Sequence, residues 1–232
     1  MLTTANPAIL YFGTPVVLVS SLNQDGSANL APMSSAWWLG WRCMLGFGAH
    51  SATPQNILRT GECVLNLPSA AMADVVDRLA LTTASNPVSE TKQKRGYRHE
   101  AQKFERAGLT PVPSESVAVP RALECPLQLE ARLAGSHRIA QENETLRNRL
   151  IALEVEIVRV HADSSILVPG ERDRIDPDKW RPLIMSFQHF YGLTPRLRPS
   201  TLATIPESVY RMAAPAPMQI GNPEASEIAT MR

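Results

Sequence analysis

Two apolar runs joined by a short polar turn are the feature that most restricts what this chain can fold into. The first run covers residues 16–21, and the second, which alternates, covers residues 28–33. Between them stand Asp25 and Gly26. An Asp-Gly pair between such runs is a strong signal for a β-hairpin. The two runs are therefore predicted to pair as antiparallel strands.

A helix is predicted over residues 54–60, directly after a cluster of small polar side chains. Thr53 takes the N-cap position, Pro54 the first helical position, and Gly61 ends the helix. A helix N-terminus flanked by hydroxyl groups suits a phosphate, because it offers free N–H groups and a positive dipole end. The competing interpretation is that Ser51 and Thr53 only cap a short helix.

The remaining pattern indicates a mainly β protein. Strands are predicted over residues 16–21, 28–33, 37–47, 63–67, 127–134 and 153–161, and helices over residues 54–60, 70–79 and 100–107. Residues 81–98 are polar and predict a long surface loop. Residues 136–149 hold a charged, helix-favouring stretch, and from residue 205 onward proline recurs without periodicity, which predicts a tail.

Composition excludes several classes of protein. The 232 residues carry a formal net charge of +1, which argues against a general attraction to nucleic acid or to an anionic membrane. No run of about 18 apolar residues exists, so no membrane span is predicted. Cys43, Cys63 and Cys125 lack zinc or disulfide spacing, and the first two are read as small buried residues. A cytoplasmic location is expected.

The order of these pieces resembles the flavin reductase-like family of FMN-binding split barrels. The resemblance lies in the strand and Asp-Gly turn, residues 29–35 (NLAPMSS), the Ser-x-Thr-x-x-Asn helix start at residues 51–56, and residues 62–68 (ECVLNLP). Lys103-Phe104, residues 107–110 (AGLT) and the strands after residues 120 and 153 continue it. It covers residues 10–195 and implies a six-stranded antiparallel Greek-key split barrel with peripheral helices. The expected domain spans residues 1–204, with an insertion at about 136–150 and a tail at 205–232.

The resemblance implies a bound FMN, with FAD as the alternative, at the interface of a homodimer. Ser51 and Thr53 are the expected phosphate anchor, and residues 29–35 are expected to pass the flavin ring. The cofactor-binding candidates are Asn29, Ala31, Pro32, Met33, Ser34, Ser35, Ser51, Ala52, Thr53 and Asn56. The alternative for Asn29 is a polar residue flanking the hairpin, for Ser34 and Ser35 an ordinary strand edge, and for Asn56 a side chain that only holds the loop.

The family pattern also suggests a substrate side. Arg95, His99 and Lys103 are candidates to bind a nicotinamide dinucleotide, and His189 and Tyr191 are candidates on the acceptor side. The alternative is a solvated charged loop and a structural tyrosine. Three tryptophans form a further cluster, with Trp37 and Trp41 predicted on one side of a strand and Trp38 on the other, in core or interface packing.

No GxGxxG motif follows a strand, and no histidine or carboxylate pair has metal-ligand spacing. The implied activity is that of an NAD(P)H-dependent flavin reductase, in which hydride moves from the nicotinamide to flavin N5 and then to an acceptor. Neither NADH nor NADPH is favoured, no catalytic residue is identified, and a flavin-dependent monooxygenase is one conceivable partner. The alternatives are an FMN-binding carrier, sensor or electron-transfer protein, or a flavoenzyme that retains FMN and reduces one small molecule.

Overall fold

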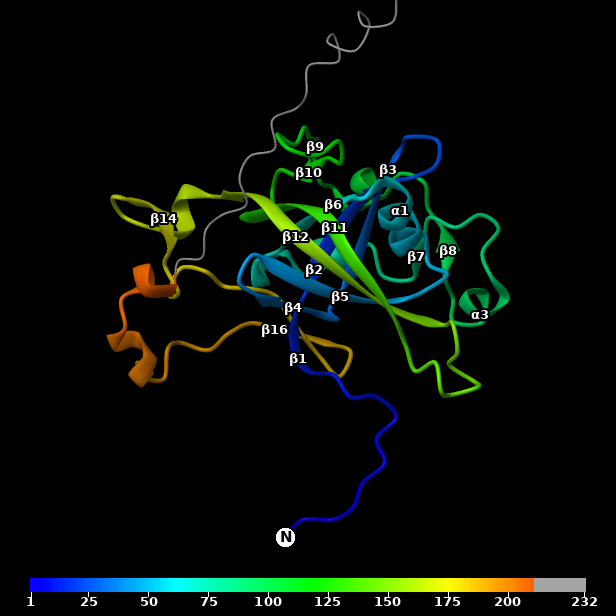
Figure 1. The fold of residues 1–232 in the computed structure, drawn as a ribbon, viewed down its shortest axis with the longest axis horizontal. Helices are drawn as coiled ribbons and strands as arrows, with labels where there is room; N and C mark the ends of the chain where they lie inside the picture. Colours follow the sequence, from blue (N-terminus) through cyan, green and yellow to red (C-terminus); the bar gives the residue numbers. More distant parts are fainter. Residues whose placement is uncertain (211–232) are drawn as a thin grey trace, which may run out of the picture.

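The computed structural model describes residues 1–210, and its centre is one seven-stranded antiparallel sheet (Figure 1). The strands follow the order β3 (Ala28–Met33), β2 (Val17–Leu22), β6 (Glu62–Leu67), β11 (Leu127–Ile139), β12 (Leu150–Ala162), β5 (Arg42–Gly48) and β4 (Ala36–Leu39). The predicted hairpin is confirmed, because β2 and β3 pair from Val17 opposite Met33 to Leu22 opposite Ala28.

The sheet has seven strands where six were predicted, because the apolar run 37–47 is a hairpin and not one strand. The chain turns at Gly40, whose φ of 58° suits glycine, and β4 pairs back on β5. This turn breaks the alternation expected of the tryptophans. Trp38 and Trp41 both pack against the core, whereas Trp37 is 58% exposed.

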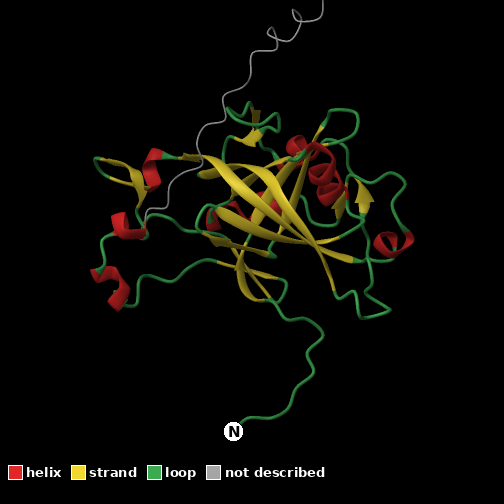
Figure 2. Cartoon of the chain, viewed as in Figure 1, coloured by secondary structure: helices red, strands yellow, loops and turns green. Residues whose placement is uncertain are grey.

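Short strands and helices surround the main sheet (Figure 2). The short strands are β1 (Phe12–Pro15), β7 (Thr82–Thr83), β8 (Arg98–His99), β9 (Pro111–Val112), β10 (Arg121–Ala122), β13 (Leu167–Val168), β14 (Glu171–Ile175), β15 (Ile184–Ser186) and β16 (His189–Tyr191). The α-helices are α1 (Ala52–Thr60), α2 (Ala73–Asp77), α3 (Glu90–Gln93) and α4 (Lys103–Ala107). The 3-10 helices are η1 (Ala70–Met72), η2 (Ser164–Ile166), η3 (Thr201–Thr204) and η4 (Glu207–Tyr210).

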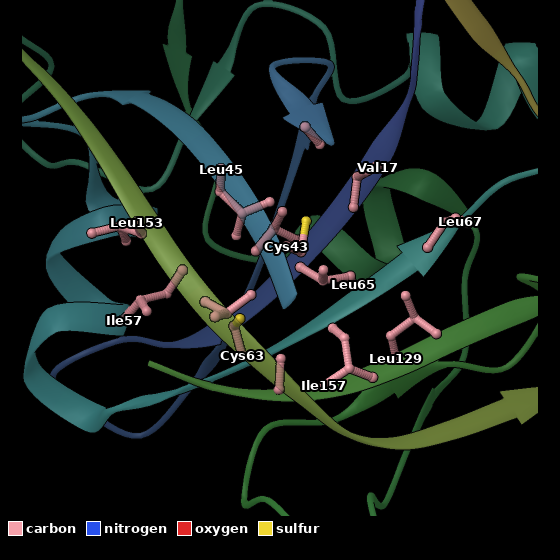
Figure 3. Packing of buried hydrophobic residues seen from close by; sticks show 14 of the residues in the cluster. Val17, Cys43, Leu45, Ile57, Cys63, Leu65, Leu67, Leu129, Leu153 and Ile157 are labelled. Atoms are coloured by element: carbon pink, nitrogen blue, oxygen red, sulfur yellow. The ribbon is translucent and has the colours of Figure 1, made fainter. Parts of the chain in front are cut away.

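The strand β2 is buried on both faces and separates two apolar clusters. Val17 and Val19 enter the larger cluster, which also holds Cys43 and Cys63 (Figure 3). Val16 and Leu18 enter the second cluster, which α2 and α4 cover. Both cysteines are fully buried, as predicted, and burial raises the pKa of the Cys43 thiol to about 12. The second cluster fixes α4 against β3, which positions the start of α4.

The charged, helix-favouring stretch in the 136–150 insertion does not form a helix. Residues 136–139 and 150–153 instead lengthen the β11–β12 hairpin, with Ile139 opposite Leu150, and residues 140–149 form turns. The Asn143 side chain accepts backbone N–H bonds from Thr145 and Leu146, which caps a turn locally. The backbone groups of residues 136–139 are already used in the sheet.

Three other predicted segments differ in detail. The helix expected at 70–79 is divided into η1 and α2, and the one expected at 100–107 is the shorter α4. The loop 81–98 contains the pair β7 and β8 and the single turn α3. Of the predicted tail, residues 205–210 are described and end in η4, and residues 211–232 lie outside the described part. No helix within residues 1–210 is long and apolar enough to cross a membrane.

Candidate functional site

One cavity brings together β3, the start of α1 and the segment 79–103. Its lining residues are Asn29, Ala31, Pro32, Met33, Phe47, Ser51, Ala52, Thr53, Leu79, Ala80, Leu81, Thr82, Thr83, Ala84, Lys92, Tyr97 and Lys103. The lining contains two lysines and no carboxylate. In Figure 1 α1 lies beside β7 and β8, so the helix start and the 79–103 segment form neighbouring walls. The cavity is therefore mixed apolar and polar, with a positive charge balance.

Asn29 lies at the junction between β3 and α1. Its Nδ2 donates to Ser21 Oγ and to Thr53 Oγ1, both at 3.1 Å. Its Oδ1 is buried and has no hydrogen-bond partner in the structure. A buried polar atom without a partner is costly, so Oδ1 is available to accept a hydrogen bond from a ligand in the cavity.

The N-terminus of α1 opens onto the same cavity. The N-cap is Ser51, with extended φ and ψ of −76° and 153°, and not Thr53 as predicted. Thr53 lies in the first turn, where its hydroxyl accepts from Asn29. Ser51 makes no side-chain cap bond, so its hydroxyl remains free for another partner. The predicted end at Gly61 is confirmed, since Gly61 has a φ of 74° and donates to Ile57 O.

Two lysines form the opposite, charged part of the lining. Lys103 begins α4 and is 3% exposed, and burial, with a smaller contribution from the charge of Lys92, lowers its pKa to about 8. Lys92 donates from Nζ to Thr83 Oγ1 at 2.9 Å and lies 5.9 Å from the ring centroid of Tyr97. Burial also lowers the pKa of Lys92.

The residues present fit an FMN. Its phosphate matches the α1 N-terminus and the lysines, and its polar ring edge or ribityl hydroxyls match the unpartnered Oδ1 of Asn29. The apolar ring matches Pro32, Met33 and Phe47. With no carboxylate in the lining, nothing there repels a dianion.

Several predicted candidates lie outside this lining. Ser34 and Ser35 connect β3 to β4, and the Ser35 carbonyl accepts from Gly46 N. Asn56 holds the hairpin, because its Nδ2 donates to Ser21 Oγ and Asn23 Oδ1. The other candidates outside the lining are Arg95, His99, His189 and Tyr191, all of them exposed.

Seven of the ten predicted cofactor residues line the cavity: Asn29, Ala31, Pro32, Met33, Ser51, Ala52 and Thr53. Lys103 lines it too. Sequence reasoning gave no signal for Phe47, Leu79 and Ala80, which also line the cavity. Residues 81–84, Lys92 and Tyr97 lie in the polar segment from which Arg95, His99 and Lys103 were chosen as candidates, but they were not singled out within it.

The chain is similar in sequence to known proteins. Residues 9–194 match the model of the flavin reductase like domain. The uncharacterized protein YdfE of Bacillus subtilis (strain 168) is 36% identical over 187 residues, which cover 81% of this chain and 87% of YdfE.

Solved structures share the fold at lower identity. Flavoredoxin of Desulfovibrio vulgaris (Miyazaki F) aligns with a TM-score of 0.69 and 23% identity, over 88% of this chain and all of that one (100%). Nitrilotriacetate monooxygenase component B from Bacillus cereus gives 0.67 and 18%, over 85% and 98% of the two chains. The 2-nitrobenzoate 2-nitroreductase NbaA of Pseudomonas fluorescens gives 0.64 and 21%, over 83% and 87%.

Proposed function

The chain belongs to the flavin reductase-like family, and on that premise we propose that it is an FMN-binding oxidoreductase that takes hydride from NADH or NADPH. The observation that carries the proposal is that three features meet in one cavity. They are the Asn29 Oδ1 without a hydrogen-bond partner, the Ser51 hydroxyl that makes no cap bond, and two lysines. A dianionic, amphipathic ligand satisfies all three features at once.

In this proposal the chain's own residues bind and orient the cofactor. Ser51, Thr53 and the first N–H groups of α1 hold the phosphate, and Asn29 accepts from the flavin through Oδ1. The bound flavin supplies the hydride-accepting chemistry. Because that step needs two rings held in register, the protein acts by positioning and requires no acid or base of its own.

The segment 79–103 is proposed to receive the nicotinamide dinucleotide. Lys103 lines the cavity, while Arg95 and His99 are exposed on the same segment, where they contact a long ligand that extends outward.

We place the reaction in the cytoplasm, because Cys43, Cys63 and Cys125 are buried free thiols, as in most proteins of a reducing compartment.

The absorbance spectrum of the purified protein, followed by NADH or NADPH under nitrogen, tests the proposal. We expect a flavin spectrum after loading with FMN and bleaching near 450 nm, about the usual flavin maximum, on addition of one nicotinamide. Bound flavin that neither nicotinamide reduces would instead favour an electron-transfer protein, as the likeness to flavoredoxin suggests. Reduction without turnover of free FMN would favour a flavoenzyme that retains its cofactor and reduces a small molecule, as the likeness to the nitroreductase suggests.

We further propose that two copies form a homodimer through an exposed apolar face. Phe12 and Leu39 are each 74% exposed and Trp37 is 58% exposed. Phe12 contacts Phe187 edge to face, with 5.3 Å between ring centroids, within the β1–β15–β16 sheet. The strand β1 also contacts β4, which carries Trp37 and Leu39. The exposed apolar side chains of Phe12, Trp37, Leu39 and Phe187 favour a partner surface that is also apolar, and a second copy of the chain supplies one.

The strand β4 is an edge of the main sheet, so a second copy also covers its open edge. His189 and Tyr191 lie on β16 and are proposed to stand at this interface, not in the cavity of their own chain. Light scattering is expected to give about twice the 25.5 kDa chain mass. Leu39→Glu is expected to produce monomers, whereas Leu123→Glu, at another exposed leucine, is not. A wild-type monomer that binds FMN would contradict the proposal.

A further inference from the structure

The long hairpin of β11 and β12 continues a sheet face that reaches the cavity. Phe47 on β5 lines the cavity and pairs with Ile151 on β12, and Ile151 pairs in turn with Arg138 on β11. Residues directly opposite one another on neighbouring strands point to the same face of the sheet. Phe47 and Ile151 both belong to the main apolar cluster. Arg138 therefore lies on the face that Phe47 presents to the cavity, two strands away.

Arg149 lies on this face too, beside Arg138. It stands two residues before Ile151, and side chains along a strand alternate between the two faces. The Ala49 N–H donates to the Arg149 carbonyl at 2.8 Å, which continues the β5–β12 register by one more pair. Two residues after Ala49 comes Ser51, which lines the cavity. Arg138 and Arg149 are thus diagonal neighbours at the end of the sheet where α1 begins.

Both arginine side chains are available to a ligand. They are exposed, and none of the hydrogen bonds or ion pairs among residues 1–210 involves either guanidinium group. Arg147, in the same turn, differs because its Nε donates to the Gln141 carbonyl at 3.0 Å. Two guanidinium groups on one face repel each other, so an anion that lies between them is attracted by both charges.

The carboxylates nearby leave this positive charge in place. Glu154 on β12 points to the other face of the sheet, where its carboxylate lies 3.5 Å from Arg42 Nη1. Glu142 and Glu144 stand in the exposed turn of the hairpin, and no ion pair within residues 1–210 joins them to either arginine. The sheet beside the cavity therefore presents two positive charges to an anionic ligand.

The place of the pair fits one end of a long ligand. Neither arginine lines the cavity, so a ligand bound there has to extend over β12 to reach them. In Figure 1 the ends of β11 and β12 run out from the sheet on the side away from β14. A nicotinamide dinucleotide is long enough to extend in this way, and NADPH differs from NADH by a 2′-phosphate at its adenosine end. Guanidinium groups bind such a phosphate through paired N–H bonds.

We propose that Arg138 and Arg149 bind the 2′-phosphate of NADPH and make the protein prefer NADPH to NADH. This rests on the proposed function, which leaves the choice between the two dinucleotides open. The nicotinamide end occupies the cavity, and the adenosine end crosses β12 to the hairpin. The extension of the hairpin carries both charges beyond the apolar core, to the place where the far end of the ligand lies.

The kinetics of flavin reduction with each dinucleotide test the inference. We expect kcat/KM of the FMN-loaded wild type to be about tenfold or more higher with NADPH than with NADH. Arg138→Ala and Arg149→Ala are each expected to raise the KM for NADPH about 5- to 20-fold and the KM for NADH much less. The kcat with NADPH should change little, because the phosphate is bound equally in the ground state and the transition state. Raising the salt concentration from about 0.05 M to about 0.5 M should reduce the preference, because salt screens exposed charges.

Two further variants serve as controls. Arg138→Lys keeps the charge but loses the paired N–H geometry, so its KM for NADPH is expected to lie between those of the wild type and Arg138→Ala. Arg172→Ala removes an exposed arginine from β14, on the other side of the molecule in Figure 1, and should keep the wild-type ratio of the two dinucleotides.

Binding of adenosine 2′,5′-bisphosphate and of AMP, measured by calorimetry, distinguishes failure of this inference from failure of the proposed function. If neither dinucleotide reduces the flavin, the proposed function is wrong, but tighter binding of the bisphosphate that Arg138→Ala removes still supports the arginine site. Equal use of NADH and NADPH by the wild type, a preference for NADH, or variants that lose both dinucleotides equally would overturn the inference. A rise in KM for a benzoate acceptor alone would overturn it as well, because the arginines would then bind the carboxylate of the acceptor.

Discussion

Asn29 and Thr53 join the predicted hairpin to the first turn of α1 through a hydrogen bond of 3.1 Å from Asn29 Nδ2 to Thr53 Oγ1. Asn29 thereby fixes the distance between β3 and the helix start, the two elements that the proposed cofactor spans. Its free Oδ1 faces no protein donor. One side chain thus serves both the fold and the cavity, and substitutions can separate these roles.

Asn29→Ala is expected to lower the free energy of unfolding more than Asn29→Asp does, whereas Asn29→Asp is expected to lower FMN affinity more. Asn29→Ala removes two buried hydrogen bonds and is expected to lower the free energy of unfolding by about 1–3 kcal/mol. Asn29→Asp replaces the donating amide by a carboxylate, which can accept from the Ser21 and Thr53 hydroxyls once they rotate, so it is expected to lower the free energy of unfolding less. Its charge repels a phosphate. FMN affinity should therefore fall more in Asn29→Asp. Urea unfolding and flavin fluorescence quenching measure the two quantities, and equal affinity losses in both variants would contradict this role.

Ser51→Ala is expected to weaken FMN without weakening the protein. The Ser51 hydroxyl makes no cap bond, so unfolding should change by less than about 0.5 kcal/mol. The loss of FMN affinity is expected to be about 1–2 kcal/mol, rising to about 1–3 kcal/mol with Thr53→Ala added.

Riboflavin, which lacks the phosphate, serves as the ligand control for Ser51→Ala. Ser69→Ala serves as the matched variant, because Ser69 is also an N-cap without a side-chain bond but lies outside the cavity. If Ser51→Ala weakens FMN and riboflavin equally, the phosphate does not lie at the start of α1.

The local signals in the sequence predicted the hairpin and the end of α1 because they act over few residues. Asp25 and Gly26 determine the turn, and Gly61 adopts the left-handed conformation that ends a helix. The missed turn in residues 37–47 has an equally local cause, Gly40, but the apolar residues on both sides concealed it. The split of that run accounts for the seventh strand.

The cavity was only partly predictable, because its second wall depends on long-range packing. Thr83, Lys92 and Tyr97 reach the cavity through the pairing of β7 with β8 and through α4 packing on β3, which no periodicity in a polar loop reveals. For the same reason, Arg95 and Lys92 were indistinguishable as charges in one loop, although only Lys92 lines the cavity. The distinction between Asn29 and Asn56 likewise requires their partners in three dimensions.

Glu130→Gln is expected to destabilise the protein in a pH-dependent way. Glu130 is fully buried, and burial alone raises its pKa. Its carboxylate accepts hydrogen bonds from the backbone N–H groups of Glu115 and Ser116 and lies 2.6 Å from the ring of His161. These contacts outweigh burial and lower the pKa of Glu130 overall. The carboxylate therefore stabilises the fold above the ordinary pKa of 4.5, and that contribution is lost as pH falls through the lower folded-state pKa.

Chemical unfolding at several pH values measures the Glu130 effect. Near neutral pH, Glu130→Gln is expected to cost about 2–3 kcal/mol, because a buried network loses its charge. The difference from wild type should shrink below pH 4.5, while Glu144→Gln, in the exposed turn, should match wild type throughout. A difference that is constant with pH would mean that Glu130 acts only through its shape.

Lys103→Met is expected to stabilise the ligand-free protein while it abolishes phosphate binding. The folded-state pKa of about 8 lies below the ordinary 10.5, so below pH 8 the folded protein bears the cost of a buried charge, which is about 1–3 kcal/mol. Between pH 8 and 10.5 the folded state releases that proton before the unfolded state does, so wild-type stability rises relative to Lys103→Met. The gap between the two is therefore expected to be largest near pH 7 and to close as pH rises. Urea unfolding of both ligand-free proteins from pH 7 to 10 measures it. If Lys103→Met is the less stable protein at pH 7, the amine is already paired in the free cavity and its cost has been misassigned.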